Sequence, residues 1–293
     1  MKTPLFTGAC TALVTPFLNG KVNLPMLEKL LQRQMDAGIG TVVLCGTTGE
    51  SPTLSAEEKI SIFRHAKDYC GSGCTILAGT GSNSTRQAME LSRAAEECGA
   101  DGLLVVSPYY NKATPEGLYA HYRAIAASVH IPVILYNVPG RTGVDIPVSV
   151  YARLAQIPNI AGVKEASTDI TKTAKIRSAC PEEFAVWSGN DDMTVPIISL
   201  GGSGVISVAS NVVPEQMQAM VQKALAGDFR CAAAMQQELL PLTELLFCEV
   251  NPIPVKAAMR HLGFDCGDCR MPLTPLLPEH EHRLKQLLSD SQG

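Results

Sequence analysis

A lysine near the end of an apolar run is the first residue of this sequence that suggests chemistry. Lys164 lies within residues 159–167, "NIAGVKEAS", which are typical of a buried strand. In the simplest interpretation the strand ends at Val163 and Lys164 faces solvent, because a buried ammonium loses its hydration. In the other interpretation Lys164 lies inside the protein and gives up its proton. The neutral amine is then a nucleophile that forms a Schiff base with a carbonyl substrate.

The residues near Lys164 in the expected fold favour the catalytic interpretation. Tyr136 ends an apolar run and is followed by a polar turn, "NVPGRTG", that contains Arg141. A tyrosine that only fills the core does not predict such a turn. Because side chains alternate along a strand, Glu165 points away from Lys164 and does not neutralise it.

Two further polar turns follow apolar runs. Thr47 and Thr48 lie between glycines in "CGTTGES", where backbone N–H groups can converge on an anion. Such a turn is more often only a turn. The stretch "SPYYN" supplies Tyr109 and Tyr110, which are either core aromatics or parts of a site.

Eight short β-rich runs alternate with helical patterns along most of the chain. Each run is apolar nearly throughout, which is typical of a parallel sheet covered by helices. Eight units at this spacing predict an α/β fold, a (β/α)8 TIM barrel, whose chemistry lies at the carboxyl ends of the strands. A doubly wound open sheet is the alternative. The runs are residues 11–17, 41–46, 75–80, 102–108, 132–138, 160–166, 184–189 and 204–210.

Local signals mark where several helices begin. Ser55 and Glu58 form the pattern of a capping box, and Ser84 and Gln87 repeat it. Thr114 precedes a proline, which predicts an N-cap followed by the first helical residue.

The β signal stops after Gly227. We expect residues 1–227 to form the catalytic barrel and residues 228–293 to form a small C-terminal helical region. The helical patterns in this region are residues 231–247, 252–263 and 278–288.

Composition limits the classes of partner. The 293 residues carry a formal net charge of −4, which argues against a general nucleic-acid binder. No uninterrupted apolar run reaches the length of a membrane span, and the N-terminal residues lack a signal-peptide core. We therefore predict a cytoplasmic protein with no membrane partner.

The ten cysteines are expected to be free thiols that behave as small apolar residues. Cys266 and Cys269 have CxxC spacing, which on its own is weak evidence for zinc, so no structural metal is predicted.

Several motifs taken together resemble one known family. They are "CGTTGESPTLS", "YYNKATPEGLYAHY", "LYNVPGRTG", "VKEAS", "SGND" and "GGSGVISVASN", in order from about Gly8 to Asn211. The combination is similar to the 4-hydroxy-tetrahydrodipicolinate synthase (dihydrodipicolinate synthase) family, within the N-acetylneuraminate lyase superfamily of class I pyruvate aldolases. Members of the family are (β/α)8 barrels with a C-terminal helical part.

The resemblance implies a role for each matching residue. Lys164 would form the Schiff base with pyruvate, and Tyr136 would donate and accept protons. Thr48 and Tyr110 would extend the proton relay, with Tyr110 supplied by a neighbouring subunit. The backbone N–H groups of Thr47 and Thr48 would bind the pyruvate carboxylate.

The remaining implied residues concern substrate binding and assembly. Gly189 and Ile206 match positions that contact the substrate through backbone carbonyls. The Tyr110 relay implies a homo-oligomer, most often a tetramer built as a dimer of dimers. Neither a metal nor another cofactor is implied.

Arg141 distinguishes among members of the superfamily, since its guanidinium can bind a carboxylate. The resemblance implies that it receives the carboxylate of L-aspartate-4-semialdehyde. The implied reaction condenses pyruvate with this aldehyde to give 4-hydroxy-tetrahydrodipicolinate, in the biosynthesis of diaminopimelate and lysine.

Regulation by lysine is expected to be weak or absent. Ser51, Asn83 and Tyr109 match polar members of the family's allosteric pocket. Two positions that are histidine in lysine-sensitive members are Ala56 and Lys59 here. Gln87 replaces a usual glutamate and cannot pair with the ammonium of a ligand.

Two other functions remain open at this level. A sister aldolase or dehydratase would keep the Schiff base and use a sugar-derived aldehyde. A barrel that only binds a keto acid would not need Lys164, Tyr136, Thr48 and Arg141 together.

Overall fold

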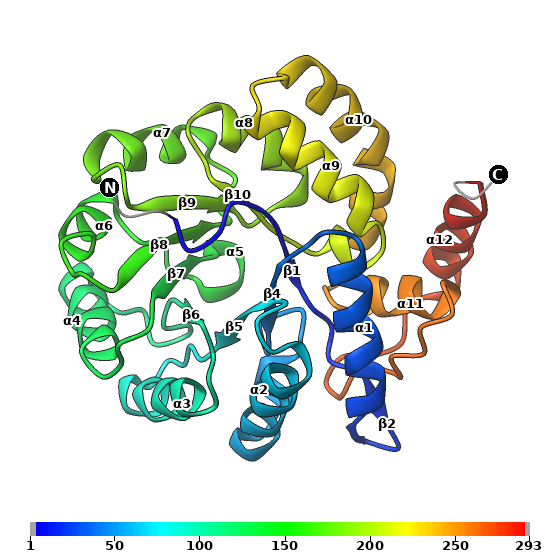
Figure 1. Ribbon diagram of the computed structural model, residues 1–293, viewed down its shortest axis with the longest axis horizontal. Helices are drawn as coiled ribbons and strands as arrows, with labels where there is room; N and C mark the ends of the chain where they lie inside the picture. Colours follow the sequence, from blue (N-terminus) through cyan, green and yellow to red (C-terminus); the bar gives the residue numbers. More distant parts are fainter. Residues whose placement is uncertain (1–3, 291–293) are drawn as a thin grey trace.

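Eight parallel strands form a closed barrel in the computed structural model, which describes residues 4–290. The order around the barrel is β1-β10-β9-β8-β7-β6-β5-β4, and β4 pairs with β1 to close it. Helices surround the strands (Figure 1), so the predicted (β/α)8 fold is confirmed. The barrel strands are β1 (Gly8–Ala12), β4 (Thr41–Leu44), β5 (Thr75–Gly79), β6 (Gly102–Val106), β7 (Val133–Asn137), β8 (Ile160–Glu165), β9 (Ala185–Ser188) and β10 (Gly204–Ser207).

The predicted position of the first strand is wrong. The apolar run predicts a strand at residues 11–17, but β1 ends at Ala12. Phe17 and Leu18 instead form β2 (Phe17–Leu18), which pairs antiparallel with β3 (Lys21–Val22) outside the barrel. The reason is the proline at position 16, which supplies no N–H to a sheet and is rare inside strands.

The helices begin largely where the sequence predicts. Ser55 and Glu58 exchange the two hydrogen bonds of a capping box, at 3.0 and 3.2 Å. The second predicted box is only half formed: Ser84 Oγ accepts from Gln87 N at 3.5 Å, whereas Gln87 Oε1 accepts from Ser82. Helices between the strands are α1 (Leu24–Asp36), α2 (Ala56–Cys70), α3 (Thr85–Glu97), α4 (Pro115–Ala126), α5 (Pro139–Thr142), α6 (Val148–Leu154), α7 (Ile170–Ala179), α8 (Thr194–Ser199) and α9 (Pro214–Leu225).

Three short 3-10 helices, η1 (Ser51–Thr53), η2 (Asp191–Met193) and η3 (Ala209–Asn211), follow β4, β9 and β10. These segments lie in the connections beyond the carboxyl ends of their strands, where a barrel enzyme carries its chemistry.

The barrel has an inner and an outer core. The larger core lies between strands and helices, and the smaller one fills the inside of the barrel. Trp187 is fully buried in the inner core, stacks on Phe6 at 4.7 Å, and donates from Nε1 to the Phe6 carbonyl. The inner core also contains Tyr136 and Ile206, so these two predicted site residues point into the barrel.

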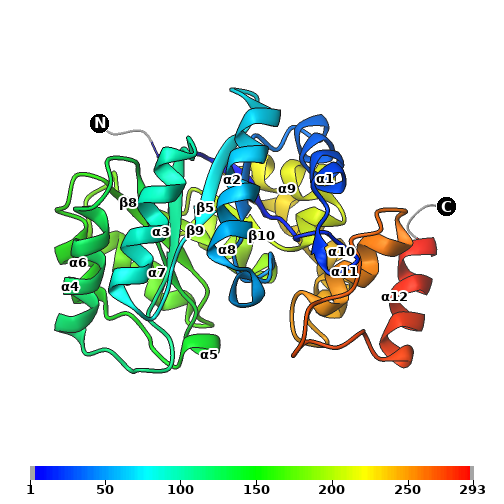
Figure 2. The ribbon, with the colours of Figure 1, turned by 90° about the horizontal axis from the view of Figure 1, so that it is seen from below.

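Three helices follow the last barrel unit: α10 (Phe229–Leu246), α11 (Ile253–His261) and α12 (Pro278–Asp290). The helix α10 packs on α9 and α8. Both views place α11 and α12 at one edge of the molecule, opposite α4 and α6 (Figures 1 and 2). The predicted boundary at Gly227 falls between α9 and α10, and the division into two domains stays a prediction.

All ten cysteines lie within the described residues and are free, as expected. Burial raises the pKa of Cys266 and of Cys269 to about 12, so both stay protonated thiols. Within residues 4–290, no helix is long and apolar enough to cross a membrane.

Candidate active site

Lys164 lies inside the barrel beside Tyr136. The register of β7 and β8 sets Tyr136 opposite Lys164, after an irregularity in β8 between Ile160 and Gly162. The Lys164 Nζ atom is 4.5 Å from the centroid of the Tyr136 ring, and the two residues are 5% and 7% exposed. The interpretation in which Lys164 faces solvent is therefore wrong.

The amine of Lys164 forms no ion pair with any described residue. Among the described residues, none of the salt bridges includes Lys164. Burial raises the pKa of Asp191 and of Cys10, and the charge of Lys164 opposes both shifts. Lys164 therefore interacts with these groups electrostatically but is not neutralised by a bound carboxylate.

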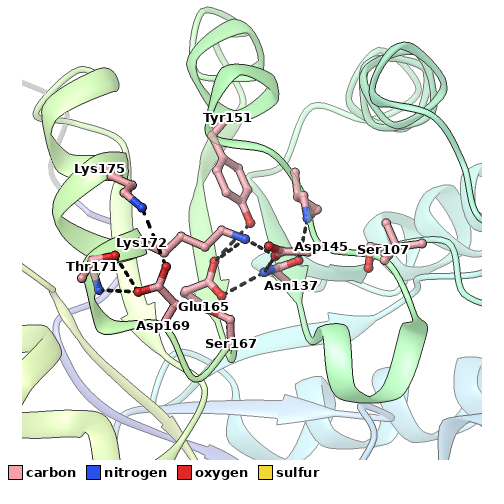
Figure 3. Close-up of polar contacts among 12 residues, drawn as sticks. Ser107, Asn137, Asp145, Tyr151, Glu165, Ser167, Asp169, Thr171, Lys172 and Lys175 are labelled. Carbon is pink, nitrogen blue, oxygen red and sulfur yellow. Dashed lines mark hydrogen bonds and ion pairs between the residues drawn. The ribbon is translucent and has the colours of Figure 1, made fainter.

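Glu165 points to the other face of the sheet, as strand alternation predicts. Its carboxylate accepts from Asn137 Nδ2 at 2.9 Å and from the Tyr151 hydroxyl at 3.2 Å, and it lies 3.8 Å from Lys172 Nζ. These partners lie outside the barrel, between strands and helices (Figure 3).

Gly189 leaves room for the lysine side chain. A Cβ atom at this position would lie 2.5 Å from Ala166 Cβ and 3.1 Å from Lys164 Cε. Its N–H donates to the Glu165 carbonyl at 2.7 Å, which fixes the end of β9 beside β8. A larger residue at position 189 would clash first with Ala166 and would also crowd the side chain of Lys164.

The turn after β4 presents unpaired donors. Thr48 is 2% exposed and Thr47 is half-buried. Neither backbone N–H has a hydrogen-bond partner among the described residues. Two adjacent free N–H groups at the carboxyl end of a barrel strand suit a carboxylate.

Asn251 is a site residue that sequence reasoning missed. Its Nδ2 donates to Thr48 Oγ1 at 3.0 Å, and its backbone carbonyl accepts from Arg141 Nη2 at 3.4 Å. Asn251 Oδ1 is buried and has no partner among the described residues. Asn251 precedes α11, so the C-terminal helical region completes the site. The proline after it, which favours an extended backbone, is the only local signal.

Arg141 and Tyr110 lie at the exposed rim. Arg141 belongs to α5 and is exposed. Tyr110 is 89% exposed and has a positive φ of 72°, which is unusual for a bulky residue. Within residues 4–290, no hydrogen bond joins the hydroxyl groups of Thr48, Tyr136 and Tyr110, so a single chain does not contain the predicted relay as direct contacts.

The residues of the predicted allosteric pocket come from three separate connections of the barrel, and Ser51 begins η1. Tyr109 is 38% exposed, and Ser51 and Asn83 are half-buried. The Asn83 carbonyl accepts from Asn111 Nδ2 at 2.9 Å, which joins the loops after β5 and β6. Lys59 is partly buried, and this burial lowers the pKa of its side chain.

Comparisons with known proteins identify the family of the chain. The family model described as the dihydrodipicolinate synthetase family matches residues 5–291. The 4-hydroxy-tetrahydrodipicolinate synthase of Acetivibrio thermocellus is 46% identical over 290 residues, 99% of each chain.

Solved structures are equally similar. The dihydrodipicolinate synthase of Aquifex aeolicus has a TM-score of 0.97 and 42% identity, with 98% of each chain covered. The chloride-inhibited enzyme of Acinetobacter baumannii, solved in complex with pyruvate, has a TM-score of 0.96 and 43% identity over 98% of this chain and 99% of that one. The present chain belongs to the dihydrodipicolinate synthetase family.

Proposed function

We propose that Lys164 is the covalent catalyst and forms a Schiff base with pyruvate. The chain is a lyase of the 4-hydroxy-tetrahydrodipicolinate synthase type, which condenses pyruvate with L-aspartate-4-semialdehyde in the biosynthesis of diaminopimelate and lysine. The observation that carries the assignment of Lys164 is its position: a buried amine without an ion pair among the described residues, 4.5 Å from the ring of Tyr136.

The formation and reaction of the imine require several proton transfers. Lys164 Nζ attacks the keto carbon of pyruvate, and loss of water from the carbinolamine gives the imine. Loss of a proton from the methyl carbon gives an enamine, whose carbon then bonds to the aldehyde carbon of the second substrate. Tyr136 is the group beside Lys164 that can donate and accept these protons.

The other predicted residues surround this pair. We assign the pyruvate carboxylate to the backbone N–H groups of Thr47 and Thr48, and contacts through backbone carbonyls to Gly189 and Ile206. Thr48 accepts a hydrogen bond from Asn251, so its own proton is free to be passed to a neighbour. Tyr110 completes the relay only when a second subunit supplies it, which agrees with its exposure of 89%. A homotetramer and a cytoplasmic location stay predictions.

Arg141 is assigned to the carboxylate of the semialdehyde. Arg141→Ala is expected to lower kcat/KM for the semialdehyde about 100-fold, because a charged partner is lost, and to leave imine formation with pyruvate intact. Arg153→Ala is the matched control, since Arg153 pairs with Glu116 on the outer helices. Unchanged turnover of the semialdehyde in Arg141→Ala would contradict the assignment.

The substrate itself is tested by consumption of aspartate-4-semialdehyde in the presence of pyruvate. Parallel reactions use N-acetylmannosamine or glyceraldehyde as the aldehyde. Turnover of the semialdehyde alone, abolished in Lys164→Ala, is expected. Turnover of a sugar-derived aldehyde instead would keep the Schiff base and contradict the second substrate.

Weak or absent inhibition by lysine is proposed on the basis of Gln87, which replaces a carboxylate that could pair with the ligand's ammonium. The semialdehyde assay with added lysine tests this. We expect most of the activity to remain at millimolar lysine, and loss of most activity at sub-millimolar lysine would contradict the proposal.

A further inference from the structure

A second pair of side chains lies directly behind the catalytic pair. In the register of β7 and β8, the pair after Tyr136 and Lys164 is Asn137 and Glu165. Because side chains alternate, this pair faces the helices while the first faces the inside of the barrel. Asn137 Nδ2 donates to Glu165 Oε1 at 2.9 Å, and the two residues are 0% and 1% exposed. Asn137 and Glu165 are also the last residues of their strands.

The carboxylate of Glu165 is held from several directions. Ser167 N donates to Oε1 at 2.8 Å, and the Tyr151 hydroxyl donates to Oε2 at 3.2 Å. Burial, followed by the charge of Glu165, holds the pKa of Tyr151 well above its usual range, so Tyr151 stays a neutral donor. The strand end, the loop after it and the helix α6 are thereby joined at one carboxylate.

Lys172, in the first turns of α7, connects this carboxylate to another. It donates to Asp145 Oδ1 and lies 3.8 Å from Glu165 Oε2, with only 6% of its side chain exposed. Asp145 Oδ1 also accepts from Asn137 Nδ2 at 2.8 Å. Asn137, Glu165, Lys172 and Asp145 therefore form a closed cycle of contacts, which we call the outer ring (Figure 3).

We propose that the outer ring positions Tyr136 and Lys164 for proton transfer. The inference rests on the proposed function of Lys164. None of the four side chains reaches into the barrel. The ring therefore acts through Asn137 and Glu165, the last residues of β7 and β8. Lys172, on α7, and Asp145, in the loop before α6, hold these two strand ends. The ring ties the ends of β7 and β8 to each other and to α7, which fixes the separation of phenol and amine. Displacement of reacting groups by about 1 Å can cost roughly 100-fold in rate.

The charges of the ring support the same role. A buried carboxylate without a partner is strongly destabilising, and Glu165 is the residue next to the nucleophile. Lys172 offsets this charge from the outer side, and the ring of Tyr151 lies 5.7 Å from its Nζ. The carboxylate of Glu165 therefore has hydrogen-bond donors and a nearby cation that do not include Lys164.

Lys172→Met removes the only cation of the ring and keeps most of the side-chain volume. We expect this variant to form the imine with pyruvate about tenfold more slowly, with the KM for pyruvate unchanged within about twofold. Borohydride quenching at successive times, followed by intact-protein mass spectrometry, measures the rate. Lys172→Arg should recover most of the rate, because a guanidinium can donate to both carboxylates.

Lys175→Met is the matched control. Lys175 lies in the same helix and pairs with Asp169 at 3.9 Å, but its side chain is 63% exposed. The Lys175→Met variant is expected to form the imine at the wild-type rate. All rates are measured well below the melting temperature of each variant, so that loss of stability alone does not lower them.

The outcomes distinguish a ring that positions Tyr136 and Lys164 from a ring that only stabilises the fold. A wild-type rate of imine formation in folded Lys172→Met, with a lower melting temperature, would overturn the proposal. If Lys172→Met does not fold, Glu165→Gln is used instead. The amide oxygen still accepts from Asn137 and Ser167, but the charge is removed. A wild-type rate of imine formation in Glu165→Gln would also overturn the proposal. Failure of the wild-type protein to form the pyruvate imine would instead contradict the proposed function.

Discussion

Lys164 and Lys172 are equally buried, at 5% exposure, and lie on opposite faces of the same barrel wall. Inside the wall, Lys164 has the ring of Tyr136 beside it and no ion pair among the described residues. Outside the wall, Lys172 contacts the carboxylates of Asp145 and Glu165. The carboxylates of Asp145 and Glu165 engage the amine of Lys172, whereas the amine of Lys164 has no such partner and can attack a carbonyl carbon. Pairing, and not burial, separates the proposed nucleophile from the structural lysine.

A third buried lysine, Lys256, extends the comparison to the turn after β4. Lys256 is 2% exposed, donates to Glu50 Oε1 at 2.9 Å and to the Asp268 carbonyl at 3.1 Å. Glu50 belongs to the turn that carries Thr47 and Thr48 and also accepts from Arg270 N. One buried lysine–glutamate pair therefore lies at the end of β8, and another lies at the turn after β4.

The largest expected effect follows loss of the inner lysine. Lys164→Ala should abolish imine formation and lower kcat about 10³-fold or more, because it removes the amine that forms the covalent intermediate. The assay is semialdehyde consumption together with borohydride trapping. Substantial turnover in Lys164→Ala would contradict the distinction between the paired and unpaired lysines.

A smaller effect is expected at the residue beside it. Tyr136→Phe keeps the ring beside Lys164 and removes the group that transfers protons, so kcat should fall about 10²- to 10³-fold. Steady-state kinetics with both substrates measure the change. A variant as active as the wild type would show that another group supplies the protons.

Loss of either paired lysine should lower the stability of the fold, by different amounts. Lys256→Met leaves Glu50 buried with few donors and should lower the free energy of unfolding by about 3 kcal/mol. Lys172→Met should cost less, about 1–2 kcal/mol, because Glu165 keeps three other donors and the side chain of Asp145 is 57% exposed. Urea denaturation ranks the two variants, and the reverse order would contradict this account of the pairs.

The sequence predicts the structure correctly where the signals are local. The barrel strands after β1 lie close to their predicted ranges, because apolar runs and capping residues act over a few positions. Strand alternation is equally local, and it correctly predicts that Glu165 and Lys164 face opposite sides of the sheet. The predicted first strand runs too far because its apolar residues continue past the proline at position 16, which breaks the strand.

Contacts between distant segments leave no such local signal. Asn251 meets Thr48 across 203 positions, and Lys256 meets Glu50 across 206. No periodicity or local motif encodes which helix of the C-terminal region reaches the barrel mouth. The partners of Glu165 are hidden for a related reason, since alternation gives the face of a side chain but not its neighbours.

The most direct test is to identify which lysine carries pyruvate. The wild-type protein is incubated with pyruvate, reduced with borohydride, digested and mapped by mass spectrometry. The account predicts a reduced adduct on Lys164 and none on Lys172 or Lys256. An adduct on either paired lysine, or none on Lys164, would contradict it.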